Sequence, residues 1–348
     1  MKRILGVLAV GVLASGLVAA PAGASSVTSD PLVSSQTVAV EVAAFWLGNG
    51  GANLKNATPY NVQTAVDEVI SGGGVSPDTK PGSVSPVLPT SSGSANGKVP
   101  TASGKVFFVG ADGQPHWCTG SAVQSQYRNL VATAGHCMYD TQRVDATLDK
   151  WVFVPGYADG TTPKGLYVGK LGFGHYDFRT YRDYDRDYAF ATVYSGVVSS
   201  ASGELSNFGR LVDNVGGQGV AWNQPLNSQV DVFGYPAGPH PDGQRPYTGE
   251  TIESSSGHTA TAMVPSLKAE QFTAVDSSFT GEGALGSSWL LHYDKGSGRG
   301  YLNGLTVSVA DTDGNLRYDT SLSPYFDGEL GAIYQAAAAS WSGSLLPG

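Results

Sequence analysis

The 348-residue chain is poor in several residue types, and each shortage excludes a class of protein. It has 20 Lys and Arg residues against 29 Asp and Glu residues, and the basic residues form no cluster. Contacts to phosphates need clustered Lys and Arg, so we expect no nucleic-acid partner. Beyond residue 24, no segment approaches the ~20 apolar residues that a membrane-spanning helix needs, so we expect no membrane partner.

Cysteine is nearly absent, since the chain contains only Cys118 and Cys137. Two cysteines do not make a structural zinc site, which needs four ligands, and we expect no metal and no cofactor. In an oxidising compartment the two cysteines are expected to form a disulfide, and closing a loop of about 20 residues contributes ~3 kcal/mol in the chain-entropy model. Two free, buried thiols are the alternative. Apart from His136, the histidines do not show the spacing of metal ligands. They are His116, His175, His240, His258 and His292.

The first 24 residues have the pattern of a secretory signal peptide. Lys2 and Arg3 supply a positive start, residues 4–18 are mostly apolar, and the small residues at 22–24 form a cleavage site. A membrane anchor is the alternative, but the apolar run is short and rich in Gly and Ala. We therefore expect a secreted, extracellular product whose net charge changes from −9 to −11 when Lys2 and Arg3 are removed. This acidity favours solubility.

Residues 25–104 form a second region, interpreted as an N-terminal segment or propeptide followed by a flexible linker. Residues 25–40 look flexible, and 41–70 form a short ordered piece with Phe45 and Trp46 as its apolar anchor. The pattern at 58–70 favours a helix, because Thr58 suits an N-cap and Pro59 the first helical position. Residues 71–104 are dominated by Gly, Ser, Pro and Thr, which is typical of a linker. The region is either a removable propeptide or a segment that stays bound across the main domain.

From residue 105 to 348 the pattern changes to short apolar runs separated by Gly, Pro and Asp. The 47 glycines suit many tight turns, and this spacing predicts an all-β, antiparallel sandwich or barrel. The expected strands lie at 106–109, 117–123, 129–134, 151–154, 188–193, 230–233, 259–264, 288–293 and 302–309. A C-terminal helix is predicted at 328–341 from the helical spacing of Leu330, Ile333, Tyr334, Ala337 and Trp341.

Three motifs resemble the first barrel of secreted bacterial trypsin-like (chymotrypsin-fold) serine proteases. They are Cys-Thr-Gly-Ser at 118–121, Asn-Leu-Val-Ala-Thr-Ala-Gly-His-Cys at 129–137 and Asp-Tyr-Ala-Phe at 187–190. Residues 279–281, 289–290 and 302–304 resemble the second barrel of glutamyl-endopeptidase-like members. The resemblance covers 105–341 and implies two antiparallel six-stranded β-barrels, at about 105–205 and 206–325, followed by the C-terminal helix.

The resemblance implies a role for two side chains. His136 matches the general base of the family, with the Cys118–Cys137 disulfide fixing its loop, and Asp187 matches the aspartate that orients the imidazole. A structural role for a lone histidine is the alternative for His136. For Asp187 the alternative is a solvated charged stretch, because Asp183 and Asp185 alternate with basic and aromatic residues.

The third member of the catalytic triad is missing from its expected place. Counting back from Trp289 aligns the family's Gly-x-Ser-Gly-Gly-Pro loop with 283–288, which puts Leu285 at the nucleophilic serine and keeps Gly283 at the leading, oxyanion-hole glycine. Leucine has no hydroxyl, so it cannot attack a carbonyl. Ser287 and Ser288 are alternative nucleophiles, but a shift of two residues moves a side chain by up to ~6–7 Å, whereas a base must lie within ~3 Å of its proton.

The sequence therefore predicts a secreted pseudoprotease. It would not hydrolyse peptides and would act, as a monomer, by binding a peptide or protein in the former substrate cleft. The first alternative is an active serine endopeptidase whose rearranged loop uses Ser287 or Ser288, and the second is a structural exported protein without a binding role. The start of a calcium loop at 311–315 lacks the required downstream glutamate and is interpreted as a hairpin turn between Val309 and Leu316.

Overall fold

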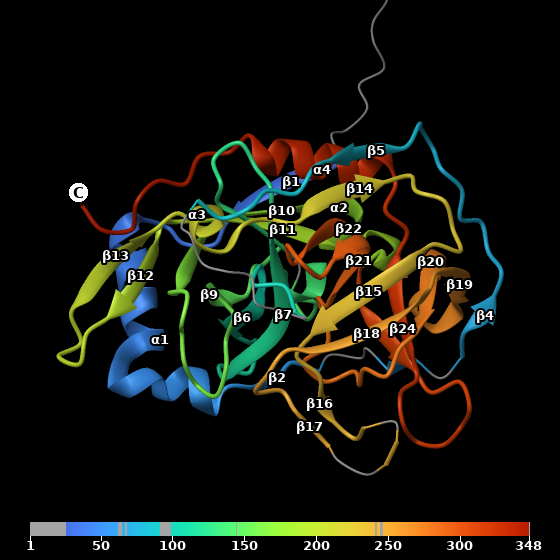
Figure 1. The fold of residues 1–348 in the computed structure, drawn as a ribbon, viewed down its shortest axis with the longest axis horizontal. Helices are drawn as coiled ribbons and strands as arrows, with labels where there is room; N and C mark the ends of the chain where they lie inside the picture. The colour runs from blue at the N-terminus through green and yellow to red at the C-terminus, as the bar shows by residue number, and fades with distance from the viewer. Residues whose placement is uncertain are drawn as a thin grey trace, which may run out of the picture.

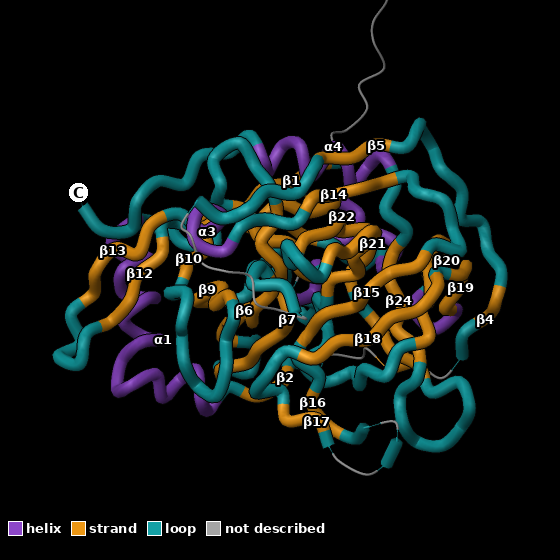
Figure 2. Tube along the Cα trace, viewed as in Figure 1, coloured by secondary structure: helices purple, strands orange, loops and turns teal. Residues whose placement is uncertain are grey.

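The computed structural model describes residues 26–61, 65–66, 68–90, 99–143, 145–240, 242–243 and 246–347. The predicted signal peptide, 1–24, lies outside these residues and stays a prediction. Among the described helices, none is long and apolar enough to cross a membrane. Strands fill the centre of the molecule and the helices lie at its periphery (Figure 2).

The N-terminal half of the main domain is a closed antiparallel barrel, drawn in teal and green in Figure 1. Its strand order is β10-β11-β8-β7-β6-β9, and β9 also pairs with β10, which closes the barrel. The strands are β6 (Ser103–Val109), β7 (Pro115–Val123), β8 (Leu130–Thr133), β9 (Asp149–Pro155), β10 (Tyr167–His175) and β11 (Ala189–Val193). A two-stranded ribbon of β12 (Gly196–Ser199) and β13 (Leu205–Gly209) follows.

The C-terminal half is a curled half-barrel made of two sheets, drawn in yellow and orange in Figure 1. One sheet contains β14 (Gly219–Trp222), β15 (Gln229–Gly234), β18 (Glu253–His258), β21 (Ser288–Asp294) and β22 (Arg299–Leu305). The other contains β19 (Ala260–Val264), β20 (Ala269–Asp276), β23 (Ser308–Ala310) and β24 (Thr320–Pro324). A small ribbon of β16 (Ala237–Gly238) and β17 (Tyr247–Thr248) extends from this half. The mostly β, two-barrel fold with a C-terminal helix is confirmed.

The described part of residues 26–90 contributes short strands that pair with both halves. The strand β1 (Val27–Pro31) pairs with β10, and β2 (Thr58–Pro59) pairs with β7. In the other half, β3 (Ala65–Val66) pairs with β23, β4 (Ile70–Ser71) with β19, and β5 (Gly82–Val84) with β14. The described part of the predicted linker therefore runs along the half-barrel with its backbone paired. Its interpretation as a propeptide or linker stays a prediction.

The N-terminal helix lies elsewhere than the sequence predicts. Helix α1 spans Gln36–Asn56, with Ser35 as its N-cap and a non-helical stretch at 48–51. The helix expected over 58–70 is wrong, because Thr58 and Pro59 form a short strand whose pairing with the barrel overrides the local capping signal. Trp46 is the predicted apolar anchor. It is fully buried, and its Nε1 donates to the Lys150 carbonyl at 2.7 Å.

The C-terminal helix α4 spans Gly328–Ala338 and begins at the N-cap Asp327, whose Oδ1 accepts from the backbone N–H groups of Glu329 and Leu330. Its apolar face is buried as predicted, at Leu330, Ile333, Tyr334 and Ala337. Trp341 is not part of this face: it lies beyond the helix, is exposed, and contacts Tyr127 edge to face. Helix α4 lies beside β1 at one edge of the molecule (Figure 1).

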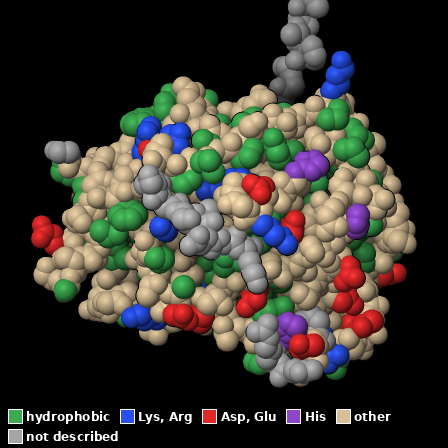
Figure 3. Space-filling model, in the orientation of Figure 1, with side chains coloured by type: hydrophobic (Ala, Val, Ile, Leu, Met, Phe, Trp, Pro, Cys, Tyr) green, Lys and Arg blue, Asp and Glu red, His purple; other side chains and the backbone are tan. Residues whose placement is uncertain are grey.

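A buried polar contact joins the two halves near the predicted site. Asp185 is buried in the 3-10 turn η2 (Tyr184–Arg186), and its carboxylate accepts from the backbone N–H groups of Glu270 and Gln271 on β20. The neighbouring Arg186 donates to Glu329 of α4 at 2.6 Å. The charged stretch around Asp187 is thus an interface between the two halves. On the face drawn in Figure 3, the Lys and Arg side chains are dispersed among acidic and uncharged ones.

Candidate active site

The barrel brings His136 and Asp187 together. His136 lies in the 3-10 turn η1 (Gly135–Cys137) after β8, and Asp187 lies between η2 and β11. These strands pair antiparallel, so both residues emerge at the same end of the barrel. Nδ1 of His136 donates to Oδ2 of Asp187 at 2.6 Å, and the backbone N–H of His136 donates to Oδ1 at 2.8 Å. His136 is 1% exposed and Asp187 0%, so this is a buried, doubly bonded pair.

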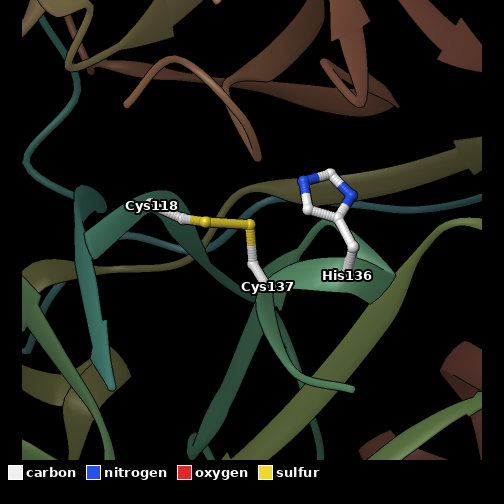
Figure 4. Close-up of side chains that lie close together, drawn as sticks. All are labelled: Cys118, His136 and Cys137. Atoms are coloured by element: carbon white, nitrogen blue, oxygen red, sulfur yellow. A yellow bond between two sulfur atoms is a disulfide. The ribbon is translucent and has the colours of Figure 1, made fainter. Parts of the chain in front are cut away.

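The two cysteines form a disulfide that fixes the turn carrying His136. Cys118 on β7 is bonded to Cys137, with the Cα atoms 6.2 Å apart. Figure 4 shows the imidazole of His136 projecting from the same turn as the disulfide. The Cys118, His136 and Cys137 ligand atoms lie close enough to suggest a metal site, but both sulfurs are used in the disulfide and neither is a free thiolate. This group therefore does not have the donors for a metal ion.

The loop that would carry the nucleophile is held against the first barrel. The backbone N–H of Thr119 donates to the Leu285 carbonyl at 2.8 Å, and Thr119 Oγ1 donates to the Gly283 carbonyl at 2.9 Å. Gly283 and Gly286 have φ angles of +71° and +83°, a region that favours glycine. At Gly286 a Cβ atom would also come within 2.1 Å of the Thr119 carbonyl oxygen. Two glycines are therefore needed for this close approach.

Leu285 is fully buried and belongs to the same apolar cluster as the disulfide. Nε2 of His136, the atom that would take a proton from a nucleophile, is buried and has no hydrogen-bond partner among the described residues. The backbone N–H groups of Gly283 and Leu285 have no hydrogen-bond acceptor among the described residues. The site thus contains a buried histidine–aspartate pair, with a hydrocarbon side chain at position 285 of the neighbouring loop.

Ser287 and Ser288 both pack within the second half of the molecule. Ser287 is buried, its Oγ donates to the Ala284 carbonyl, and it faces β15 closely enough that a Cβ atom on Gly234 would lie 1.8 Å from it. Ser288 begins β21, where it pairs with Phe233 and Leu305, and its hydroxyl has no described partner. Neither hydroxyl is hydrogen-bonded to His136.

One aromatic residue beside His136, Tyr60, could not be anticipated from the sequence. The Tyr60 ring lies 6.5 Å from the imidazole, centroid to centroid, with the two planes at 24°. Tyr60 also meets Phe108 edge to face at 4.8 Å, and its backbone N–H donates to the Trp117 carbonyl at 2.9 Å. It is only 5% exposed. Nothing in the sequence around Tyr60 links it to the barrel, so only the tertiary structure identifies it.

A second unpredicted feature lies behind the Gly283 turn. The Lys105 side chain is 1% exposed and its Nζ lies 3.7 Å from the Trp117 ring centroid and 4.2 Å from that of Tyr157. The rings of Phe107 and Tyr235 lie within 5.7 Å and 5.6 Å of the same nitrogen. Burial lowers the pKa of Lys105 to about 7, and only the charge of Glu250 opposes this shift. The Trp117 ring also packs against Gly283. Lys105 therefore contacts the loop at Gly283 indirectly, through the Trp117 ring.

The hairpin predicted after Val309 is present, but its turn is longer than predicted. β23 and β24 pair antiparallel, and residues 311–319 connect them. The turn does not end at Leu316, which is exposed. The carboxylates of Asp311, Asp313 and Asp319 lie within 4.8 Å of one another, and those of Asp311 and Asp319 accept hydrogen bonds from backbone N–H groups of their own loop. These hydrogen bonds show that the carboxylates stabilise the turn.

The fold is similar to those of solved bacterial proteases. The protease Anisep from Arthrobacter nicotinovorans is 24% identical, over 73% of this chain and 100% of its own, with a TM-score of 0.57. A thermostable serine protease, AL20, from an extremophilic microorganism is 24% identical, over 69% of this chain and 98% of its own, with a TM-score of 0.56. No family model matches the chain, and no curated protein matches it. At this level of identity the likeness shows the fold alone, which is that of trypsin-like serine proteases.

Proposed function

We propose that the protein is a secreted, non-catalytic homologue of the trypsin-like serine proteases that acts as a monomer by binding a peptide or protein beside the former catalytic residues. The observation that carries this proposal is the environment of His136 Nε2. The position that the resemblance assigns to the nucleophile is Leu285, and no described hydroxyl is bonded to this nitrogen. General-base catalysis needs such a hydrogen bond before a serine can be activated.

Export is part of the same proposal. The apolar N-terminal run supports it, and so does the Cys118–Cys137 disulfide, since disulfides persist mainly in oxidising compartments. The free N–H groups of Gly283 and Leu285 support retention of an oxyanion-hole-like turn. Such a turn can still bind the carbonyl of a peptide without cleaving it.

The second candidate function is an active endopeptidase that uses Ser287 or Ser288. Its only support is that both hydroxyls lie within three residues of the nucleophile position. Against it, the Ser287 hydroxyl is engaged by the Ala284 carbonyl and faces β15, so it would need a rearranged loop to reach His136. We therefore favour the non-catalytic function.

A fluorophosphonate probe, which labels activated serines, tests this choice. We expect no labelling of the secreted chain, nor of Tyr60→Ala, in which the cover over His136 is removed. The second variant is needed because the imidazole is buried in the native chain. Stoichiometric labelling of either protein that disappears on Ser287→Ala or Ser288→Ala would establish the endopeptidase. That function also predicts hydrolysis of casein that survives Leu285→Ser.

A further inference from the structure

We propose that the side of His136 on which a peptide would bind is already occupied by a segment of this same chain. The segment, here called the strap, consists of the described residues 58–61 and 65–66. An external peptide would bind beside His136 only by displacing the strap. The proposal that the strap lies beside His136 does not require the proposed function. Only the binding of an external peptide rests on the proposed function.

The first end of the strap is bound as an added strand. Thr58 and Pro59 pair in parallel with His116 and Trp117 of β7, and Thr58 Oγ1 lies 2.9 Å from His116 Nδ1. The next residue, Tyr60, continues this contact through its backbone N–H and places its ring beside His136, with the centroids 6.5 Å apart. This combination of backbone pairing with a buried aromatic side chain is how protein grooves commonly recognise extended peptides.

The second end is bound by the other half of the molecule. Ala65 and Val66 pair in parallel with Val309 and Ala310 of β23. Val66 is buried in the same apolar cluster that contains Tyr60, Leu285 and the disulfide. Leucine at position 285 thus supplies apolar surface to the cluster in which the strap is buried. A serine there would give up part of that surface.

Both flanks of the strap are anchored. Before it, α1 buries Trp46 against the first barrel, and β1 pairs with β10 along five residues. After it, β4 pairs with β19 and β5 with β14. A segment tethered on both sides faces its binding site at an effective concentration on the order of millimolar. A free peptide at micromolar concentration therefore competes poorly against it.

The strap also defines the chemistry of a displacing ligand. Its contacts are backbone hydrogen bonds, one aromatic ring and one β-branched aliphatic side chain, and none of them is an ion pair. The ligand class is an extended, uncharged peptide with an aromatic residue followed six positions later by an aliphatic residue, as in Tyr60 and Val66.

Chemical modification of histidine tests the strap on the unaltered chain. Diethyl pyrocarbonate reacts with accessible imidazoles, and the exposed His258 and His292 serve as internal standards. We expect His136 to react at least about tenfold more slowly than these two, since it is reached only through local opening. In Tyr60→Ala we expect His136 to react at a rate approaching theirs, whereas Ile70→Ala, altered at an exposed side chain just after the strap, leaves it protected. Modification of His136 in the native chain at the rate of His258 would overturn the proposal.

A binding measurement tests the displacement. A fluorescein-labelled peptide copying residues 57–66 is titrated with the native chain, Tyr60→Ala, Val66→Ala and Ile70→Ala, and polarisation is recorded. We expect at least about tenfold tighter binding to the first two variants than to the native chain and Ile70→Ala, because a weakened strap competes less. Equal affinity for all four proteins would contradict the proposal. Labelling of Tyr60→Ala by a fluorophosphonate would refute the non-catalytic function but leave the strap in place.

Discussion

Asp187 holds His136 by two hydrogen bonds at once, through the imidazole Nδ1 at 2.6 Å and through the backbone N–H at 2.8 Å. The opposite nitrogen of the same ring, Nε2, has no described partner. The contacts that fix the orientation of the imidazole are therefore present, whereas no described hydroxyl is bonded to its outer nitrogen. We expect a buried pair of this kind to contribute to stability, whatever its chemical role.

The first prediction concerns this pair. Asp187→Ala leaves two buried donors of His136 without an acceptor, and each unsatisfied buried donor costs about 1–3 kcal/mol. We expect a loss of roughly 3–5 kcal/mol in the free energy of unfolding. Asp187→Asn keeps an acceptor for the backbone N–H and is expected to lose about half as much. Urea denaturation of the three proteins measures both values; a change below about 1 kcal/mol in Asp187→Ala would contradict a stabilising role.

The second prediction concerns Leu285, which is fully buried. Leu285→Ser removes buried hydrocarbon and adds a hydroxyl, so we expect a loss of about 2–4 kcal/mol in the free energy of unfolding. If the new hydroxyl lies next to Nε2 of His136, the hydrogen bond offsets about 1 kcal/mol of this loss. The matched control is Leu322→Ser, a fully buried leucine of the same cluster on β24. An equal or larger loss in Leu285→Ser than in the control would count against the alignment of position 285 with the nucleophile.

The proximity of His136 and Asp187 and the disulfide could be predicted from the sequence because their signals are local. Cys118, His136, Cys137 and Asp187 stand in short motifs, each next to an apolar strand whose register fixes where it points. Tyr60 gave no such signal. Its position depends on pairing between residues more than 50 apart in the sequence, and the local capping pattern at Thr58 and Pro59 favoured a helix instead.

Strand β10 shows a second reason for failure. It was missed because Gly169, Gly172 and Gly174 make it look like a loop. Added Cβ atoms at these glycines would lie 2.5–2.8 Å from side chains packed over the strand, at Leu32, Trp151, Met138 and Tyr139. The glycines thus make room for bulky neighbours on the barrel, one of them from the N-terminal segment. Composition alone does not distinguish a glycine required by tertiary packing from one in a turn.

The third prediction concerns the Cys118–Cys137 disulfide. The cysteines are 19 residues apart, so the bond constrains a loop for which the chain-entropy model gives ~3 kcal/mol. We expect the double variant Cys118→Ala, Cys137→Ala to lose about this amount in the free energy of unfolding, measured in urea. The control is the native chain with reductant, which should move to the stability of the double variant once alkylation shows that the bond is broken. A stability unchanged by reduction would contradict the prediction.

The last prediction concerns pH and Lys105. Its ammonium group is enclosed by the rings of Phe107, Trp117, Tyr157 and Tyr235, and burial lowers its pKa to about 7. The ring faces attract the cation and Glu250 also favours the charged form, but burial is the larger effect. Because the unfolded lysine titrates near 10.4, the unfolded state binds more protons than the folded state between about pH 7 and 10.

Stability attributable to Lys105 should therefore rise with pH across this window, and the cost of burying its charge should be greatest below pH 7. The facing tyrosines do not oppose this trend below pH 9, since burial raises the pKa of both Tyr157 and Tyr235. Lys105→Met keeps the aliphatic packing and removes the titration. We expect the difference in unfolding free energy between the native chain and this variant to shift in favour of the native chain by about 1–2 kcal/mol between pH 7 and 9. Urea titrations at both pH values measure the shift; parallel pH dependence of the two proteins would mean that Lys105 keeps its charge inside the aromatic cage, with cation–π attraction outweighing desolvation.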